Sequence, residues 1–551
     1  MTLLDYFNRL STLLIAYIFL KKIFKINCKT LLTRCLLSIP SIRSRYHTEI
    51  NKEKTKFIES IKATWKDFHP LITEIPKKGY SYNQCLRIIK QYSQMTLEKI
   101  KNNHYSGTIY QAKLLHDYEE LELQPSLESL YMEIFRRSYL WNSLHDHEFP
   151  VANIINYQIV SMIAELFGGD KNTVMGLVTT GGTQSLMNTA RSYVNYGVMI
   201  KKLDSHDCVI IAPNTIHPAI MKAQDAYHFK LILIKTNIHG TCDIQDLQAK
   251  VKYHKRNLIA LFCSVPSYPY GTIDNIEIFS SLASKYQVGL HVDCCLGGFI
   301  VNFMETDILK FPGVTSLSVD THKNGQAPKG SSVLIYKQLG EQNMLYYSIY
   351  AVTNSLCGIY GSPKDEGSQS CTESFCALIT LLYYGKERYI DIATNICQTV
   401  SNIKDFLSTF PAVQIINPQT SVNIIAFKID NIEGATYRLS DIMGTKGFVF
   451  NTLTNNIIHF CVTDRFAYDN VNNQNFKKCF EESYQQLMSE IVDGKEFDGS
   501  ARMYCSINKA LRPKVENKNY TKYIENSLFG ELGVRDAIRN HFLALNNPYY
   551  Q

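Results

Sequence analysis

Short apolar runs separated by helix-like stretches occupy the middle of the chain. The runs are rich in Val, Ile and Leu and do not alternate with polar residues, which indicates strands buried on both faces of a mainly parallel sheet. Seven such runs occur, at 176–179, 208–212, 231–234, 258–263, 289–292, 316–319 and 333–336. We therefore expect a large α/β domain with a seven-stranded sheet over residues 151–373.

The pattern changes on both sides of this region. Residues 46–150 have mostly helical spacing and are expected to form a helical N-terminal segment. On the other side, strand-like runs mix with helical stretches, which predicts a smaller C-terminal α/β domain over residues 374–551. The helical stretches are at 374–407, 475–492 and 518–545, and the strand-like runs are at 421–429, 448–451 and 457–462.

The N-terminus carries one apolar run, LSTLLIAYIFL at residues 10–20, with Arg9 before it and Lys21 and Lys22 after it. The run is shorter than the roughly 17–25 residues that span a bilayer, although basic side chains at its ends can reach the interface. We interpret residues 1–45 as a membrane anchor with a basic stem, which would place the rest of the chain in the cytosol. A helix lying on the membrane surface is the alternative.

Composition narrows the class of protein. At 551 residues, with 45% hydrophobic and 19% charged residues, the chain is an ordinary globular protein with more than one domain. Much of its excess positive charge lies before residue 46, so a membrane-facing stem explains it better than nucleic-acid binding does. The 15 cysteines form no CxxC pair and no metal-ligand spacing. They indicate buried, reduced thiols, and we expect no metal site.

Polar residues follow the predicted strands at four places. The turn TTGGTQS, with Gly182 and Thr183 inside it, precedes a helix whose free N–H groups can bind an anion. His217 comes after the next strand, Asp293 ends a later one, and Lys323 lies in the loop after the strand that follows. Because ligands of such sheets bind beyond the carboxyl ends of the strands, these residues are expected to lie near one site.

This set of side chains fits pyridoxal 5'-phosphate. The cofactor needs a lysine that it binds as a Schiff base and a carboxylate beside its pyridine nitrogen, and Lys323 and Asp293 are the candidates. His217 would stack on the ring, and the glycine-rich turn would hold the phosphate. Each residue alone has an ordinary interpretation, as a helix cap, a solvated lysine or a packed histidine. Their occurrence in sheet order favours the cofactor site.

Several motifs resemble those of the sphingosine-1-phosphate lyase family, within the group II pyridoxal-phosphate decarboxylases. The most specific are HVDCCLGGF and SVDTHKNGQAPKGSS, which contain Asp293 and Lys323. Further similar motifs are TTGGTQS, APNTIHPA, IPKKGYSYNQCL, YSGTIY, CSVPSYPYGTID, GIYGSP, ATYRLSDIMGTKGF and IHFCVT. The resemblance is dense over residues 70–465, and the N-terminus is similar to the membrane anchor of eukaryotic members.

The resemblance implies a fold-type I pyridoxal-phosphate transferase-like architecture and a role for each matching residue. Lys323, His217 and Asp293 would be catalytic and hold the cofactor, with help from Gly182, Thr183, Ser318 and His322. Lys329, Asn142 and His145 would contact the substrate. The resemblance also implies a homodimer whose 357–370 loop reaches the partner's site, and a place on the endoplasmic reticulum membrane facing the cytosol.

The expected reaction is retro-aldol cleavage of the C2–C3 bond of a phosphorylated long-chain base, which yields a long-chain aldehyde and phosphoethanolamine. Three positions depart from the family pattern. Asn324 and Gln326 replace two tyrosines after the lysine, and Gln369 replaces an arginine. An amide does not replace a bidentate arginine contact to phosphate. Two alternatives therefore stay open: a catalytically impaired homologue that serves as a dimerising partner, and an amino-acid decarboxylase.

Overall fold

The computed structural model describes residues 126–139, 141–144, 150–170, 174–302, 307–356, 358–420 and 422–501, with a few isolated positions before and after them. The chain divides into two compact units, and all elements below belong to the unit Leu97–Arg502. The expected anchor, the expected helix at 518–545 and His145 lie outside the described residues. Within the described part of the chain, no helix has the length and apolar character needed to cross a membrane.

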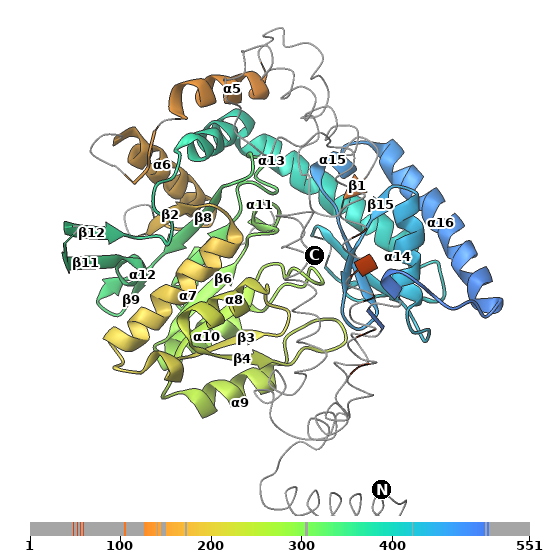
Figure 1. Ribbon diagram of the computed structural model, residues 1–551, viewed down its shortest axis with the longest axis horizontal. Helices are drawn as coiled ribbons and strands as arrows, with labels where there is room; N and C mark the ends of the chain where they lie inside the picture. Colours follow the sequence, from red (N-terminus) through yellow and green to blue (C-terminus); the bar gives the residue numbers. More distant parts are fainter. Residues whose placement is uncertain are drawn as a thin grey trace, which may run out of the picture. The chain divides into compact units, whose positions relative to one another are not determined.

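A seven-stranded sheet with strand order β2-β8-β7-β6-β5-β3-β4 forms the larger layer of this unit (Figure 1). Only β8 runs antiparallel to its neighbours, so the sheet is mainly parallel. The strands are β2 (Met175–Thr179), β3 (Val209–Pro213), β4 (Lys230–Ile234), β5 (Leu258–Ser264), β6 (Gly289–Asp293), β7 (Ser316–Val319) and β8 (Ser332–Tyr336). Each predicted run became a strand, with ends that differ by at most one residue, so the predicted sheet is confirmed.

Helices cover both faces of this sheet, which explains why its strands do not alternate. Every residue of β3, β5, β6, β7 and β8 is buried. The helices of this region are α5 (Leu127–Ser138), α6 (Pro150–Leu166), α7 (Gly182–Met199), α8 (Ala219–Tyr227), α9 (Ile244–His254), α10 (Ile276–Tyr286), α11 (Gly298–Val301) and α12 (Met344–Ser348). A strand that is buried on both faces has no side turned to solvent, so polar residues do not alternate with apolar ones along it.

Helix α7 is tied to the sheet by Tyr193. The ring is fully buried, and its hydroxyl lies 2.7 Å from the side-chain oxygens of both Thr315 and Ser316. Gly289, the first residue of β6, makes room for the ring, because a Cβ there would lie 2.0 Å from Cε1 of Tyr193. This close contact fixes α7 over the strand that ends in Asp293.

A second, four-stranded antiparallel sheet follows in the chain, with strand order β13-β14-β17-β16. Its elements agree with the mixed pattern predicted for this region. They are α13 (Thr372–Leu407), β13 (Val413–Ile415), β14 (Ile424–Ile429), α14 (Ala435–Thr445), β15 (Phe448–Val449), β16 (Asn451–Leu453), β17 (Ile457–Cys461), α15 (Asp464–Ala467) and α16 (Asn470–Val492). Long helix α13 bends at Gly385, which has φ of 63° and ψ of 171°.

The unit also contains smaller elements. The β1 strand (His104–Tyr105) pairs in parallel with β15. A hairpin of β11 (Tyr350–Ser355) and β12 (Gly358–Ser362) leads into the loop before α13, and β9 (Gln338–Leu339) pairs with β10 (Gln342–Asn343). The loop before α13 is the one that the family resemblance assigns to the partner's site.

Candidate active site

A cavity of about 400 Å³ lies where the loops after β2, β3, β5, β6 and β7 meet. Its size is in the range of small-molecule sites. Six residues singled out from the sequence line it: Gly182, Thr183, His217, Asp293, His322 and Lys323. The sheet thus brings together side chains that are up to 141 positions apart, as expected for the carboxyl edge of parallel strands.

Lys323 forms an ion pair inside this cavity. Its Nζ lies 2.8 Å from Oδ2 of Asp320, and Asp320 is only 1% exposed. Burial alone would lower the pKa of the Lys323 ammonium, but the Asp320 carboxylate outweighs it and the pKa is raised. Burial would likewise raise the pKa of Asp320, and the Lys323 charge, followed by His322, holds it below its usual range. Both groups are therefore charged at neutral pH.

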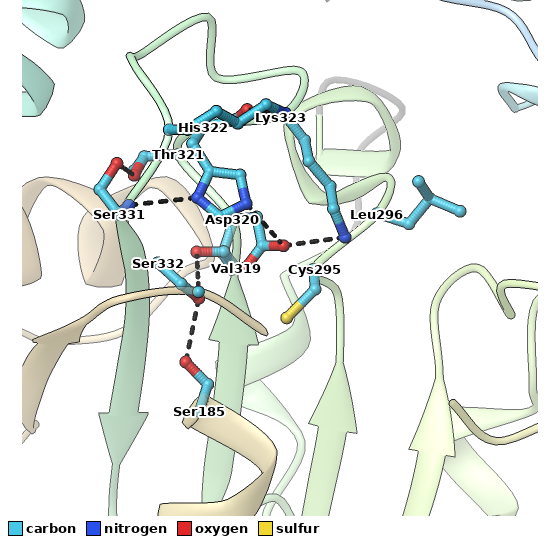
Figure 2. A network of polar contacts seen from close by, with 12 residues as sticks. Ser185, Cys295, Leu296, Val319, Asp320, Thr321, His322, Lys323, Ser331 and Ser332 are labelled. Atoms are coloured by element: carbon cyan, nitrogen blue, oxygen red, sulfur yellow. Dashed lines mark hydrogen bonds and ion pairs between the residues drawn. The ribbon is translucent and has the colours of Figure 1, made fainter. Parts of the chain in front are cut away.

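The loop that carries Lys323 is fixed by its own hydrogen bonds (Figure 2). The backbone N–H of Ser331 donates to Nδ1 of His322 over 3.1 Å, so Nε2 carries the proton and faces Oδ2 of Asp320 at 3.5 Å. Burial lowers the pKa of His322, which favours this neutral form. The hydroxyl of Thr321 donates to Ser331 over 2.7 Å. These contacts hold the lysine in the cavity.

The turn before α7 offers an anion site beside this ion pair. Helix α7 has no side-chain cap at its N-terminus, so its first N–H groups are not satisfied by a capping side chain. A Cβ on Gly182 would lie 2.8 Å from Sγ of Cys295 and 3.0 Å from Oδ2 of Asp320, so only glycine fits there. Ser185 of α7 lies 2.9 Å from the Ser332 hydroxyl, which reaches the Val319 carbonyl at the end of β7. The turn and the lysine loop are thereby linked.

Asp293 is the last residue of β6, the strand next to β7, and β7 leads into the loop that carries Lys323. Asp293 is 7% exposed, and its Oδ1 accepts a hydrogen bond from the N–H of Cys295 at 3.0 Å and from the Ser318 hydroxyl at 3.5 Å. Ser318 is fully buried on β7 and also contacts the buried imidazole of His291. Ser318, which was expected to help hold the cofactor, does not line the cavity, and its hydroxyl contacts the Asp293 carboxylate.

His217 stands in the loop after β3. Its Nδ1 accepts a hydrogen bond from the N–H of Ala219 at 3.2 Å, which leaves the proton of the neutral ring on Nε2. Burial lowers the pKa of the imidazole, against an opposing effect of Asp293. The ring also meets Tyr268 edge to face, at 5.5 Å between centroids. A neutral flat ring in this position is suited to stacking on a planar ligand.

The expected substrate contacts are farther from the cavity. Lys329 does not line it, and its amine donates to the His322 carbonyl over 3.2 Å. Asn142 holds the loop before α13: its amide donates to Ser368, and its Oδ1 accepts from the N–H of Gln369. His145 is not among the described residues.

The three departures from the family pattern also lie outside the cavity lining. Asn324 and Gln326 are buried, and the Asn324 amide donates to the Leu296 carbonyl over 2.8 Å. Gln369 accepts a hydrogen bond from the amine of Lys364 over 2.8 Å. In this chain the three amides support loops around the site.

The sequence analysis gave no role to several residues that line the cavity, among them Asp320, Cys295 and Tyr268. Asp320 lies three residues before Lys323 in the motif SVDTHKNGQAPKGSS. A carboxylate so close to the lysine in a short loop could have predicted the ion pair. Tyr268 lies in CSVPSYPYGTID, where no local pattern distinguishes a cavity residue from its neighbours.

The ion pair predicts how the Lys323 amine titrates. Replacing Asp320 by Asn removes the charge that raises the pKa of Lys323, so we expect the amine to lose its proton at lower pH than in the wild-type apoprotein. Acetylation with trace acetic anhydride across a pH series, read out by peptide mass spectrometry, measures this midpoint. Asp307→Asn, which removes the exposed partner of Lys310, is the control and should not move the Lys323 midpoint. An unchanged or higher midpoint in Asp320→Asn would contradict the assignment.

Comparison with known proteins agrees with this chemistry. Residues 90–429 match the family model described as the pyridoxal-dependent decarboxylase conserved domain. Sphingosine-1-phosphate lyase 1 of Rattus norvegicus is 30% identical over 470 residues, which are 84% of this chain and 78% of the relative. The sphingosine-1-phosphate lyase of Saccharomyces cerevisiae is 30% identical over 508 residues, or 90% of this chain and 82% of the relative.

Solved structures give the same result. The sphingosine-1-phosphate lyase of Burkholderia pseudomallei superposes with a TM-score of 0.67 at 26% identity, over 78% of this chain and 98% of that one. Glutamate decarboxylase of Lactobacillus brevis has a TM-score of 0.61 at 16% identity, over 77% of this chain and 96% of that one, which shows a shared fold. The chain thus belongs to the sphingosine-1-phosphate lyase family, within the pyridoxal-dependent decarboxylases.

Proposed function

We propose that this chain cleaves the C2–C3 bond of sphingosine 1-phosphate or a related long-chain base phosphate. The observation that carries the proposal is the cavity in which Lys323, Asp293, His217 and the uncapped N-terminus of α7 meet. An amine, a carboxylate, a flat neutral ring and an anion site are the four groups that pyridoxal 5'-phosphate requires. The relatives at 30% identity bear the name of this lyase.

The residues present fit the cofactor. Lys323 would hold it covalently, Asp293 would keep its ring nitrogen protonated, His217 would cover the ring and the turn at Gly182 and Thr183 would bind its phosphate. The space that a Cβ on Gly182 would fill is the cradle in which backbone can approach a phosphate. When bound, the cofactor accepts the electron pair of the breaking bond.

The reaction is redox-neutral. The proton of the substrate's 3-hydroxyl is removed, the C2–C3 bond breaks, C3 becomes the aldehyde carbon and C2 gains a proton, which leaves phosphoethanolamine. The chain's own contribution is to orient the reacting groups and to hold the charges in place before the reaction. His291 behind Asp293 is buried, which lowers its pKa to about 4, so it is neutral and does not compete for the Asp293 charge.

Substrate phosphate would be received near Lys329. Its ammonium lies next to the lysine loop and is partly exposed, so a phosphate can reach it from solvent. Lys364, which donates to Gln369 and to the Val178 carbonyl, supplies a second positive charge near the position where the family carries an arginine. The positions of the three departures outside the cavity lining favour an active lyase over the impaired homologue.

Turnover tests the proposed function. Purified protein supplied with pyridoxal 5'-phosphate should release a long-chain aldehyde from sphingosine 1-phosphate, and much less from sphingosine, which lacks the phosphate. Lys323→Ala should reduce release to background, because it removes the amine that is paired with Asp320 inside the cavity. Lys386→Ala, which changes an exposed ion pair, should keep full activity. An active Lys323→Ala enzyme would refute the role of Lys323. Wild-type protein that binds the cofactor but releases no aldehyde would refute the substrate.

We also propose that the active form is a homodimer attached to the cytosolic face of the endoplasmic reticulum membrane. Exposed apolar side chains on α5 and α6 support a contact surface, since Phe135, Tyr139, Ile154 and Tyr157 are each more than half exposed. The loop before α13 would reach the partner's site. The apolar run at 10–20 with its basic flanks would provide the attachment, and a lipid substrate gives the reason for it.

Removing residues 1–45 tests both parts of this proposal. We expect full-length protein to sediment with membranes and the truncated protein to remain in the supernatant. Light scattering of the truncated protein should give twice the mass of one chain. A truncated protein that still sediments with membranes would contradict the anchor, and a monomer at micromolar concentration that is fully active would contradict the shared site.

A further inference from the structure

Tyr268 lies between two imidazole rings. It belongs to the loop after β5, lines the cavity and is half-buried. On one side its ring meets His217 at 5.5 Å with an interplanar angle of 76°, and on the other it meets His459 at 5.0 Å with an angle of 81°. Both are edge-to-face contacts, the favourable arrangement for aromatic pairs. The three rings therefore form a continuous row of edge-to-face contacts that starts in the cavity.

His459, the ring farthest from the cavity, is held in a fixed orientation. His459 lies on β17 and is completely buried. The amide of Asn451 donates to its Nε2 over 2.9 Å, so Nδ1 carries the proton and donates to the Pro269 carbonyl, also over 2.9 Å. Burial lowers the pKa of His459 to about 4, which keeps the ring neutral at physiological pH. A ring with both nitrogens engaged cannot turn without breaking a buried hydrogen bond.

The loop that carries Tyr268 is also held firmly. The Ser267 and Thr272 hydroxyls lie 2.6 Å apart, and the amide of Asn417 donates to the Gly271 carbonyl over 3.2 Å. Tyr268 and Tyr270 both pack against an apolar cluster that contains Leu296, a cavity residue, together with Ile424 and other residues of the smaller sheet. The smaller sheet thus supports the Tyr268 ring from behind.

His217 is held by fewer hydrogen bonds than His459 is. One hydrogen bond, from the N–H of Ala219, anchors its Nδ1. One hydrogen bond at Nδ1 only partly restricts rotation of the imidazole about its Cα–Cβ and Cβ–Cγ bonds. Contact with the Tyr268 ring restricts this motion, because the two rings meet edge to face.

We propose that Tyr268 is a positioning residue that sets the orientation of His217 and transmits the support of the smaller sheet, through His459, to the cofactor. The inference rests on the proposed function, because His217 is taken to cover the ring of pyridoxal 5'-phosphate. The Tyr268 ring, and not its hydroxyl, makes both contacts.

Three substitutions of Tyr268 and one of Tyr270 separate this role from simple packing. Tyr268→Phe keeps the ring, whereas Tyr268→Leu and Tyr268→Met remove it. Tyr270→Leu removes a ring from the same loop and the same apolar cluster, but Tyr270 does not line the cavity. For each full-length protein we would titrate pyridoxal 5'-phosphate and record visible circular dichroism of the bound cofactor, with thermal unfolding of the apoprotein to measure stability.

We expect Tyr268→Leu and Tyr268→Met to weaken cofactor binding about tenfold and to diminish the dichroism band. Tyr268→Phe and Tyr270→Leu should bind within about twofold of wild type, because an aromatic contact of this size is intact. Wild-type binding in both ring-deleted variants would overturn the inference. A loss in Tyr268→Phe equal to that in Tyr268→Leu would assign the role to the hydroxyl and overturn it, and an equal loss in Tyr270→Leu would reduce it to loop packing. If wild-type protein binds no cofactor, the proposed function itself fails.

Discussion

The buried ion pair between Lys323 and Asp320 is the interaction on which the site depends. Removing one partner of such a pair leaves an uncompensated charge, at a cost of about 3–5 kcal/mol. The folded protein would often be as stable with two apolar side chains of the same volume in place of this ion pair. Stability therefore does not explain the ion pair, and we look for its reason in the function of Lys323. Asp320 holds the amine inside the cavity and raises its pKa. A lysine that lines a cavity and has a shifted pKa indicates an active site.

The Lys323–Asp320 ion pair lies among other functional groups because loops from several strand ends meet around it. Asp293 ends β6, His217 follows β3, and the turn at Gly182 opens α7, so each group comes from a different strand end. Hydroxyls at the strand ends connect these loops: Ser318 supports Asp293, and Ser332 links the lysine loop's strand to α7. Short, buried contacts of this kind restrict how far the charged groups move before a ligand binds. The smaller sheet adds its own support through the edge-to-face contacts of His459, Tyr268 and His217.

The sequence predicted the larger sheet well, and the physical reason is clear. Each strand is buried on both faces, so its apolar run is short, continuous and bounded by polar loops. The residues that line the cavity were predictable where they follow those runs directly, as Asp293 and Lys323 do. Tyr268 was missed because its role comes from tertiary contacts with His217 and His459, which are 51 and 191 positions away. Ser318 lies within a quoted motif, but the motif does not show whether its side chain faces the cavity or contacts Asp293.

Chemical trapping of the bound cofactor tests whether Lys323 is the residue that holds it. Wild-type protein incubated with pyridoxal 5'-phosphate would be reduced with borohydride, digested and analysed by peptide mass spectrometry. We expect a single phosphopyridoxyl group, on Lys323, and none in Lys323→Ala treated in the same way. A label on Lys222 or Lys329 in place of Lys323, or no label on a protein that is folded, would contradict it.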